Sequence, residues 1–177
     1  MTDRFVVLTG GPGSGKTTLV ERLGTLGYAT SAEASRAMIR DQKAVGGPVS
    51  YERDPVRYAE FILVWELRSY REALSAPGPV FFDRGMPDVA SIHLQLGVPV
   101  PSHVSAAADR YRYGTAFIAP PWPEIYVHDE DRTHTWEHAV AVYEALLESY
   151  VRFGYALVEL PRVSVEDRVA FVLDRVT

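Results

Sequence analysis

The stretch GGPGSGKT at residues 10–17 decides the fold of this chain. It matches the phosphate-binding pattern G-x-x-x-x-G-K-[ST], which requires a strand before it and a helix after it. Residues 4–9 are short, apolar and rich in β-branched side chains, as expected of a buried parallel strand. A helix is expected to follow Gly15. The context therefore indicates a P-loop rather than a chance glycine-rich turn.

The chemistry of this loop predicts a site for ATP and Mg²⁺. Its glycines let the backbone turn tightly, so that N–H groups and a helix N-terminus face the phosphates. Lys16 adds a full positive charge, and Thr17 offers a hydroxyl to the metal. The expected nucleotide-binding residues are Gly10, Gly11, Pro12, Gly13, Ser14, Gly15, Lys16, Thr17 and Thr18.

A second apolar strand, residues 80–83, ends at Asp83 and is followed by Arg84. Ligands bind at this edge of parallel sheets, so Asp83 should face the P-loop. Two roles are open for it: support of magnesium, or general base toward an attacking hydroxyl. It could also only cap a turn. Arg84 could clamp a phosphoryl oxygen, and Asp88 is either a substrate ligand or a charge favoured by the helix dipole.

The rest of the chain alternates strands with helices, which predicts a three-layer α/β fold with a five-stranded parallel sheet. We expect a single domain over residues 1–177. Asp54-Pro55 is typical of a helix start, and the helix that follows is predicted to be long and largely buried. Its aromatic residues at helical spacing are expected to pack in the core rather than to form an acceptor platform: Tyr58, Phe61 and Trp65. Further strands are expected at 28–31, 115–119 and 155–160, and a capping box at Ser164 opens the last helix.

Composition narrows the class of protein. A net charge of -5 argues against nucleic-acid binding. The absence of cysteine removes disulfides and thiolate metal sites, and it fits a reducing compartment. No apolar run reaches the roughly 18 residues of a membrane span, and the start lacks the features of a signal peptide. We therefore expect a cytoplasmic protein with neither nucleic acid nor membrane as a partner.

Several motifs occur together with the P-loop: Glu33 with Arg36 after the second strand, DRG followed by Asp88, and PPW before EIY. In this combination the chain resembles the AAA-type predicted ATPases related to ribosylnicotinamide kinase, within the nucleoside and nucleotide kinase-like P-loop group. The resemblance implies a kinase-like fold with a small lid near residues 122–135.

The resemblance also implies roles for individual residues. Asp83 would lie between the P-loop and the acceptor, and Glu33 and Arg36 would line the acceptor site. Arg132 would close over the phosphates, and Arg162 would lie near the adenine. Each has a simpler alternative: Glu33 and Arg36 could form a surface ion pair, and Arg132 could be a solvated loop charge.

The segment His134-Thr-Trp-Glu137-His138 matches H-x-x-E-H, the signature of inverted zinc peptidases. Its third ligand would be Glu144 or Glu148. Because the match begins in a loop of a chain that already carries a strong P-loop, a zinc hydrolase is only a remote alternative.

The leading hypothesis is a kinase that transfers the γ-phosphate of ATP to a hydroxyl or phosphate group of a small molecule. Regulatory GTPases are set aside, because their N-K-x-D motif needs an Asn and the chain has none. The main alternative is an ATPase that acts as a regulatory switch. The acceptor and the oligomeric state are left open.

Overall fold

The computed structural model describes residues 3–126 and 135–176. Within them, five strands form one parallel sheet in the order β2-β3-β1-β4-β5. The strands are β1 (Phe5–Gly10), β2 (Ala29–Ser31), β3 (Val80–Asp83), β4 (Thr115–Ala119) and β5 (Leu157–Glu159). The predicted three-layer α/β fold with a parallel sheet is confirmed.

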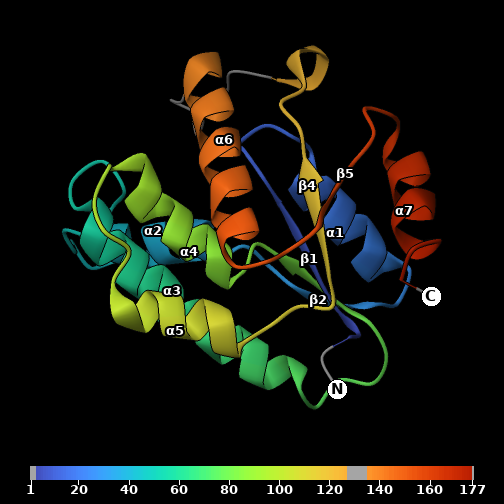
Figure 1. The fold of residues 1–177 in the computed structure, drawn as a ribbon, viewed down its shortest axis with the longest axis horizontal. Helices are drawn as coiled ribbons and strands as arrows, with labels where there is room; N and C mark the ends of the chain where they lie inside the picture. Colours follow the sequence, from blue (N-terminus) through green and yellow to red (C-terminus); the bar gives the residue numbers. More distant parts are fainter. Residues whose placement is uncertain (1–2, 127–134, 177) are drawn as a thin grey trace.

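Helices cover both faces of the sheet (Figure 1). One face carries α1 (Lys16–Thr25) and α7 (Val165–Leu173). The opposite side carries α2 (Ala34–Ala44), α3 (Pro55–Ala73), α4 (Met86–Gln95), α5 (Ser102–Arg110) and α6 (Trp136–Arg152). A 3₁₀ turn, η1 (Pro123–Ile125), follows β4. None of the described helices is long and apolar enough to cross a bilayer.

The central strand β1 is buried along its whole length and divides the core in two. Phe5 and Val7 pack on the side of α3, α4 and α6, whereas Val6 and Leu8 pack on the side of α1 and α7. Side chains alternate between the faces of a strand, so a continuous apolar run in a sheet covered on both sides serves both core layers. This explains why residues 5–8 are all apolar.

The predicted helix starts at Asp54 and Ser164 are confirmed. The Asp54 carboxylate accepts a hydrogen bond from the backbone N–H of Arg57 at 3.0 Å, and Pro55 occupies the first turn of α3. The Ser164 hydroxyl accepts one from the N–H of Asp167 at 3.2 Å. Both caps satisfy donors that a helix N-terminus would otherwise leave unpaired.

The prediction that α3 is largely buried was wrong. Only one stripe of the helix is buried, and Phe61 is 42% exposed. Tyr58 and Trp65 do pack against the core, but the Tyr58 ring also lines a cavity. Helical spacing places side chains on a face; it does not say whether that face meets the core or a cavity.

Strand register brings the two strongest motifs together. β1 and β3 are neighbours, and Leu8 pairs with Asp83. Since both strands end at the carboxyl edge of the sheet, the P-loop after β1 and Asp83 at the end of β3 lie side by side.

Candidate active site

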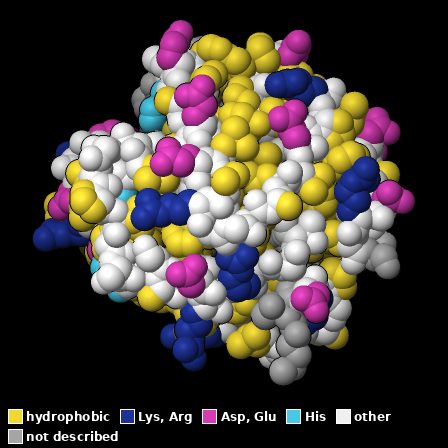
Figure 2. All heavy atoms as spheres, in the orientation of Figure 1, with side chains coloured by type: hydrophobic (Ala, Val, Ile, Leu, Met, Phe, Trp, Pro, Cys, Tyr) yellow, Lys and Arg dark blue, Asp and Glu magenta, His cyan; other side chains and the backbone are white. Residues whose placement is uncertain are grey.

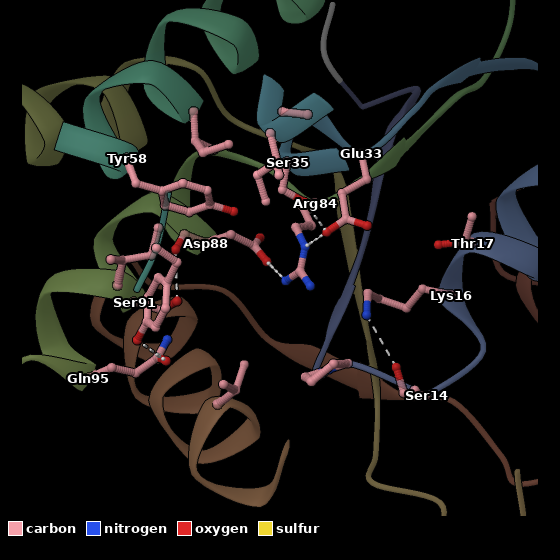
Figure 3. A pocket seen from close by; sticks show the side chains of 18 of the residues that line it. Ser14, Lys16, Thr17, Glu33, Ser35, Tyr58, Arg84, Asp88, Ser91 and Gln95 are labelled. Carbon is pink, nitrogen blue, oxygen red and sulfur yellow. Dashed lines mark hydrogen bonds and ion pairs between the residues drawn. The ribbon is translucent and has the colours of Figure 1, made fainter. Parts of the chain in front are cut away.

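The P-loop has the backbone conformation that its glycines predict. Gly13 and Gly15 have φ values of 73° and 81°, in the left-handed region that other residues rarely adopt. A Cβ atom on Gly13 would also come within 2.6 Å of the Tyr126 ring. The loop encloses the Lys16 side chain, whose Nζ donates to the Gly11 carbonyl at 2.8 Å and to the Ser14 hydroxyl at 3.3 Å (Figure 3).

Lys16 is buried, with 5% of its surface exposed. Burial, together with the nearby positive charge of Arg84, lowers the pKa of Lys16 to about 8, against the opposing effect of Asp83 and other carboxylates. A buried ammonium group that lacks full compensation favours a bound anion. Lys16 is therefore suited to a phosphate group.

Asp83 and Thr17 form a pair of oxygen ligands beside the P-loop. The Thr17 hydroxyl donates to Asp83 Oδ2 at 3.1 Å. The other oxygen, Oδ1, is buried and has no hydrogen-bond partner among the described residues. Burial raises the pKa of Asp83, partly offset by Lys16. A hydroxyl and a carboxylate with a spare oxygen are the hard ligands that Mg²⁺ prefers, so the residues fit this ion.

Arg84 lies at the centre of the site with a backbone φ of 80°, a conformation that is uncommon for a residue other than glycine. Its Nε donates to Glu33 Oε1 at 3.0 Å, and its Nη1 donates to Asp88 Oδ1 at 3.2 Å (Figure 3). Burial opposes its charge, but Glu33, Asp88 and Asp83 outweigh that effect and raise the pKa of Arg84. The guanidinium group is thus held charged and in a fixed orientation.

Asp88 is buried, and both of its oxygens are already engaged. Oδ1 accepts from Thr9 at 2.7 Å and from Arg84, and Oδ2 accepts from Tyr150 at 2.7 Å and from the Gly85 N–H at 3.0 Å. Although Asp88 borders the cavity, these contacts make it a support for Arg84 more than a ligand for substrate.

Glu33 borders the cavity at the N-terminus of α2. Besides Arg84, the Ser35 hydroxyl donates to its carboxylate at 2.6 Å. Burial alone would raise the pKa of Glu33, but Arg84 and Lys16 outweigh it and bring the pKa to about 2. Its carboxylate is therefore ionised at neutral pH and can accept a hydrogen bond from a hydroxyl group.

These residues border a cavity of about 270 Å³ with two walls. The P-loop wall consists of residues 12–18. The acceptor wall faces it across Arg84; in Figure 3, Tyr58, Ser91 and Gln95 lie opposite Lys16 and Ser14. The acceptor wall is made of Tyr51, Glu52, Tyr58, Ile62, Glu66, Ser91, Ile92, Gln95, His138 and Val142.

Several predicted site residues either do not border this cavity or fall outside the described part of the structure. Arg162 donates to the Pro121 carbonyl at 3.1 Å and borders a second hollow beside α6 and η1, where Figure 2 shows hydrophobic side chains gathered on this face. Arg36 belongs to α2, but its side chain is outside the described part of the structure, as are Arg132 and most of the predicted lid. Gly10, Gly11 and Asp83 are not among the residues that border the cavity.

The H-x-x-E-H segment is only partly described. His134 lies outside the described residues, Glu137 is exposed on α6, and His138 borders the cavity. Within residues 3–126 and 135–176, no group of three potential ligands is placed to hold a metal ion.

Sequence reasoning missed two buried charged residues. Arg168 on α7 donates to the Ser14 carbonyl at 2.7 Å and lies 4.7 Å from the Trp122 ring centre, so it supports the P-loop from the C-terminal helix. Glu66 on α3 is 2% exposed and borders the cavity. For Glu66, the available signal was a charged residue within the apolar stripe of a predicted helix. For Arg168, no local sequence pattern indicated a contact with the P-loop.

Comparisons with known proteins agree with this fold. The family model described as AAA domain matches residues 5–168. No curated protein matches the chain. The NadR protein in complex with NR superposes with a TM-score of 0.76 at 20% identity, over 97% of this chain and 51% of that one. The NadR protein in complex with NAD and AMP-PNP superposes with a TM-score of 0.70 at 19% identity, over 98% of this chain and 51% of that one.

Deoxyadenosine kinase from M. mycoides, with the products dCMP and dCDP bound, gives a TM-score of 0.70 at 12% identity, over 97% of both chains. The present chain therefore spans about half the length of the NadR chains and nearly all of the deoxyadenosine kinase. At these identities the likeness shows the fold, which is that of small P-loop kinase-like proteins.

Proposed function

Because the chain belongs to the AAA-domain family of P-loop proteins, we propose that it is an ATP-dependent kinase acting on a small molecule. It would transfer the γ-phosphate of ATP to a hydroxyl or phosphate group of the acceptor. The observation that carries this proposal is the acceptor wall, which extends the phosphate site into a cavity for a second molecule. A switch ATPase needs only ATP and water beside its P-loop.

The P-loop wall would bind the nucleotide. The backbone N–H groups of residues 12–18 and the Lys16 ammonium group would contact the β- and γ-phosphates. Thr17 and Asp83 would hold Mg²⁺, which would neutralise charge on the phosphate oxygens. Arg84, fixed between Glu33 and Asp88, is placed to stabilise charge on the transferred phosphoryl group.

The acceptor wall would orient the attacking hydroxyl. Its oxygen would form a bond to the γ-phosphorus while the bond to the β-phosphate oxygen breaks, releasing ADP and a proton. Glu33 is ionised and borders the cavity, so it would accept the hydrogen bond of that hydroxyl. A carboxylate of low pKa is a weak base, but phosphoryl transfer depends mainly on positioning.

Asp83 remains the second candidate for the base because its Oδ1 is unpaired among the described residues. Its hydrogen bond to Thr17, and the fact that it does not border the cavity, favour metal support instead. We therefore assign the acceptor side to Glu33 and the metal side to Asp83.

The test is a transfer assay with γ-labelled ATP. Purified protein is given nucleosides, ribosylnicotinamide or other hydroxyl compounds, alongside a water-only control. We expect label in an organic product and ATP consumption at least about tenfold faster with the right acceptor. Label found only in inorganic phosphate, at a rate that no compound changes, would instead support a switch ATPase.

A further inference from the structure

Glu66 borders the cavity but has no part in the proposed transfer step. α3 presents a stripe of side chains at four-residue spacing: Tyr58, Ile62, Glu66 and Tyr70. The first three border the cavity, whereas Tyr70 packs in the core against Phe5. Glu66 thus lies where the stripe passes from the cavity into the core.

The Glu66 side chain is buried at the edge of the cavity, which its carboxyl group borders. Its residue is 2% exposed, and none of the described residues forms a hydrogen bond or ion pair with it. The nearby cation, Arg84, is already bound to Glu33 and Asp88. Buried polar groups are normally paired, so a carboxyl group that faces a cavity without a partner points to a ligand.

The charges around Glu66 set its protonation state. Burial is the main cause that raises the pKa of Glu66 well above its usual range, and the negative charge of Asp88 adds to it. Arg84 opposes this shift, but its charge is shared among several carboxylates. A protonated carboxyl group has one O–H donor, which the described residues do not use.

We propose that Glu66 determines acceptor specificity by donating a hydrogen bond from its carboxyl group to an uncharged oxygen or nitrogen atom of the acceptor. The proposal rests on the kinase function above. Ile62, Ile92 and Val142 offer apolar contacts nearby, and Tyr51 and Tyr58 offer aromatic rings. The ligand class is therefore a hydroxyl compound that carries a planar, mainly apolar group with a carbonyl oxygen or a ring nitrogen.

The first experiment needs no ligand. Thermal unfolding is measured for wild type, Glu66→Gln and Glu66→Leu, with Glu72→Gln and Glu72→Leu as controls on the exposed side of the same helix. An unpaired buried carboxyl group weakens the fold, so Glu66→Leu should melt at the same temperature as wild type or higher. A clear fall in the melting temperature for both Glu66 variants would show a structural role and overturn the proposal.

The second experiment measures phosphorylation and binding with a stated panel: adenosine, deoxyadenosine, cytidine, deoxycytidine and ribosylnicotinamide. For the best acceptor, Glu66→Leu should raise KM about tenfold to a hundredfold, because a buried lone pair loses its donor. Glu66→Gln keeps an N–H donor and should stay within about threefold of wild type. The KM for ATP and both Glu72 variants should not change.

The outcomes separate this inference from the kinase function. An equal rise in the acceptor KM for Glu66→Gln and Glu66→Leu would show that a charged carboxylate binds a cationic acceptor. An unchanged acceptor KM in both variants would show that Glu66 does not contact the acceptor. Either result overturns the proposal. Binding is also followed by thermal shift with AMP-PNP present. A wild-type protein that binds a panel compound without phosphorylating it refutes the kinase function, while the variants still test Glu66 through affinity. If no compound binds or reacts, both ideas fail.

Discussion

The P-loop wall comes from consecutive residues, whereas the acceptor wall comes from separate helices and from the turn before α3. Glycine conformations and one lysine define the first wall. The second wall depends on how α4 packs against α3 and against α6. In the proposed kinase, phosphate binding would thus be encoded locally, and acceptor recognition would be encoded by tertiary packing.

The largest expected effect is on the P-loop wall. Lys16→Ala removes a charge preorganised for the transferred phosphoryl group, and should lower turnover by about a hundredfold or more, or roughly 3 kcal/mol. The only other lysine, Lys43, is exposed on α2, so Lys43→Ala is the matched control. Near-normal turnover in a folded Lys16→Ala protein would refute the assignment of this loop.

A smaller effect is expected at Arg168, and it tests whether the P-loop wall depends on a contact from the distant helix α7. Arg168→Met leaves the Ser14 carbonyl without its donor and should lower the free energy of unfolding by about 2 kcal/mol. ATP affinity, measured by calorimetry, should also fall, because the loop loses a support. Arg175 donates to the Phe171 carbonyl of α7 at 3.0 Å, so Arg175→Met should leave ATP affinity unchanged. Unchanged ATP affinity in Arg168→Met would leave Arg168 only a structural role.

The smallest expected effect is the pH dependence of stability that Glu66 of the acceptor wall contributes. The folded pKa of Glu66 lies above its ordinary value of 4.5, so the folded protein keeps a proton that the unfolded chain releases. Wild type should therefore lose stability relative to Glu66→Gln as pH rises from about 4.5 toward that folded pKa, by up to about tenfold per pH unit in the unfolding equilibrium constant.

Denaturant titrations of both proteins at several pH values would measure this difference. The charged and titratable groups that act on Glu66 are Asp88, Arg84, Asp83, Glu33 and Tyr113. They are the same in both proteins, so their own titration largely cancels in the comparison. Parallel stability curves would show that Glu66 is ionised in the folded protein.

The same contrast explains what could be predicted from the sequence. The strands, the P-loop and the caps at Asp54 and Ser164 depend on local spacing, and all are present in the structure. The position of Asp83 beside the P-loop followed from two strands that end at one edge of the sheet.

Contacts between distant residues could not be predicted in this way. Arg168 reaches Ser14 across 154 residues, and the Arg84 ion pair brings Glu33 to a residue 51 positions away. The exposed Phe61 and the cavity-lining Tyr58 share one helix with the same periodicity. The predicted roles of Arg132 and the lid fall outside the described residues and stay predictions.

The central claim is that Asp83 serves the metal and nucleotide while Glu33 serves the acceptor. The most direct test titrates magnesium at fixed ATP with Asp83→Asn and Glu33→Gln, following nucleotide affinity and phosphotransfer together. We predict that Asp83→Asn loses nucleotide affinity and phosphotransfer in parallel and recovers both with excess magnesium. Glu33→Gln should bind ATP within roughly tenfold of wild type but transfer phosphate at least about tenfold more slowly at any magnesium concentration. Normal transfer by Glu33→Gln, with a loss in Asp83→Asn that magnesium does not restore, would contradict the claim and make Asp83 the base.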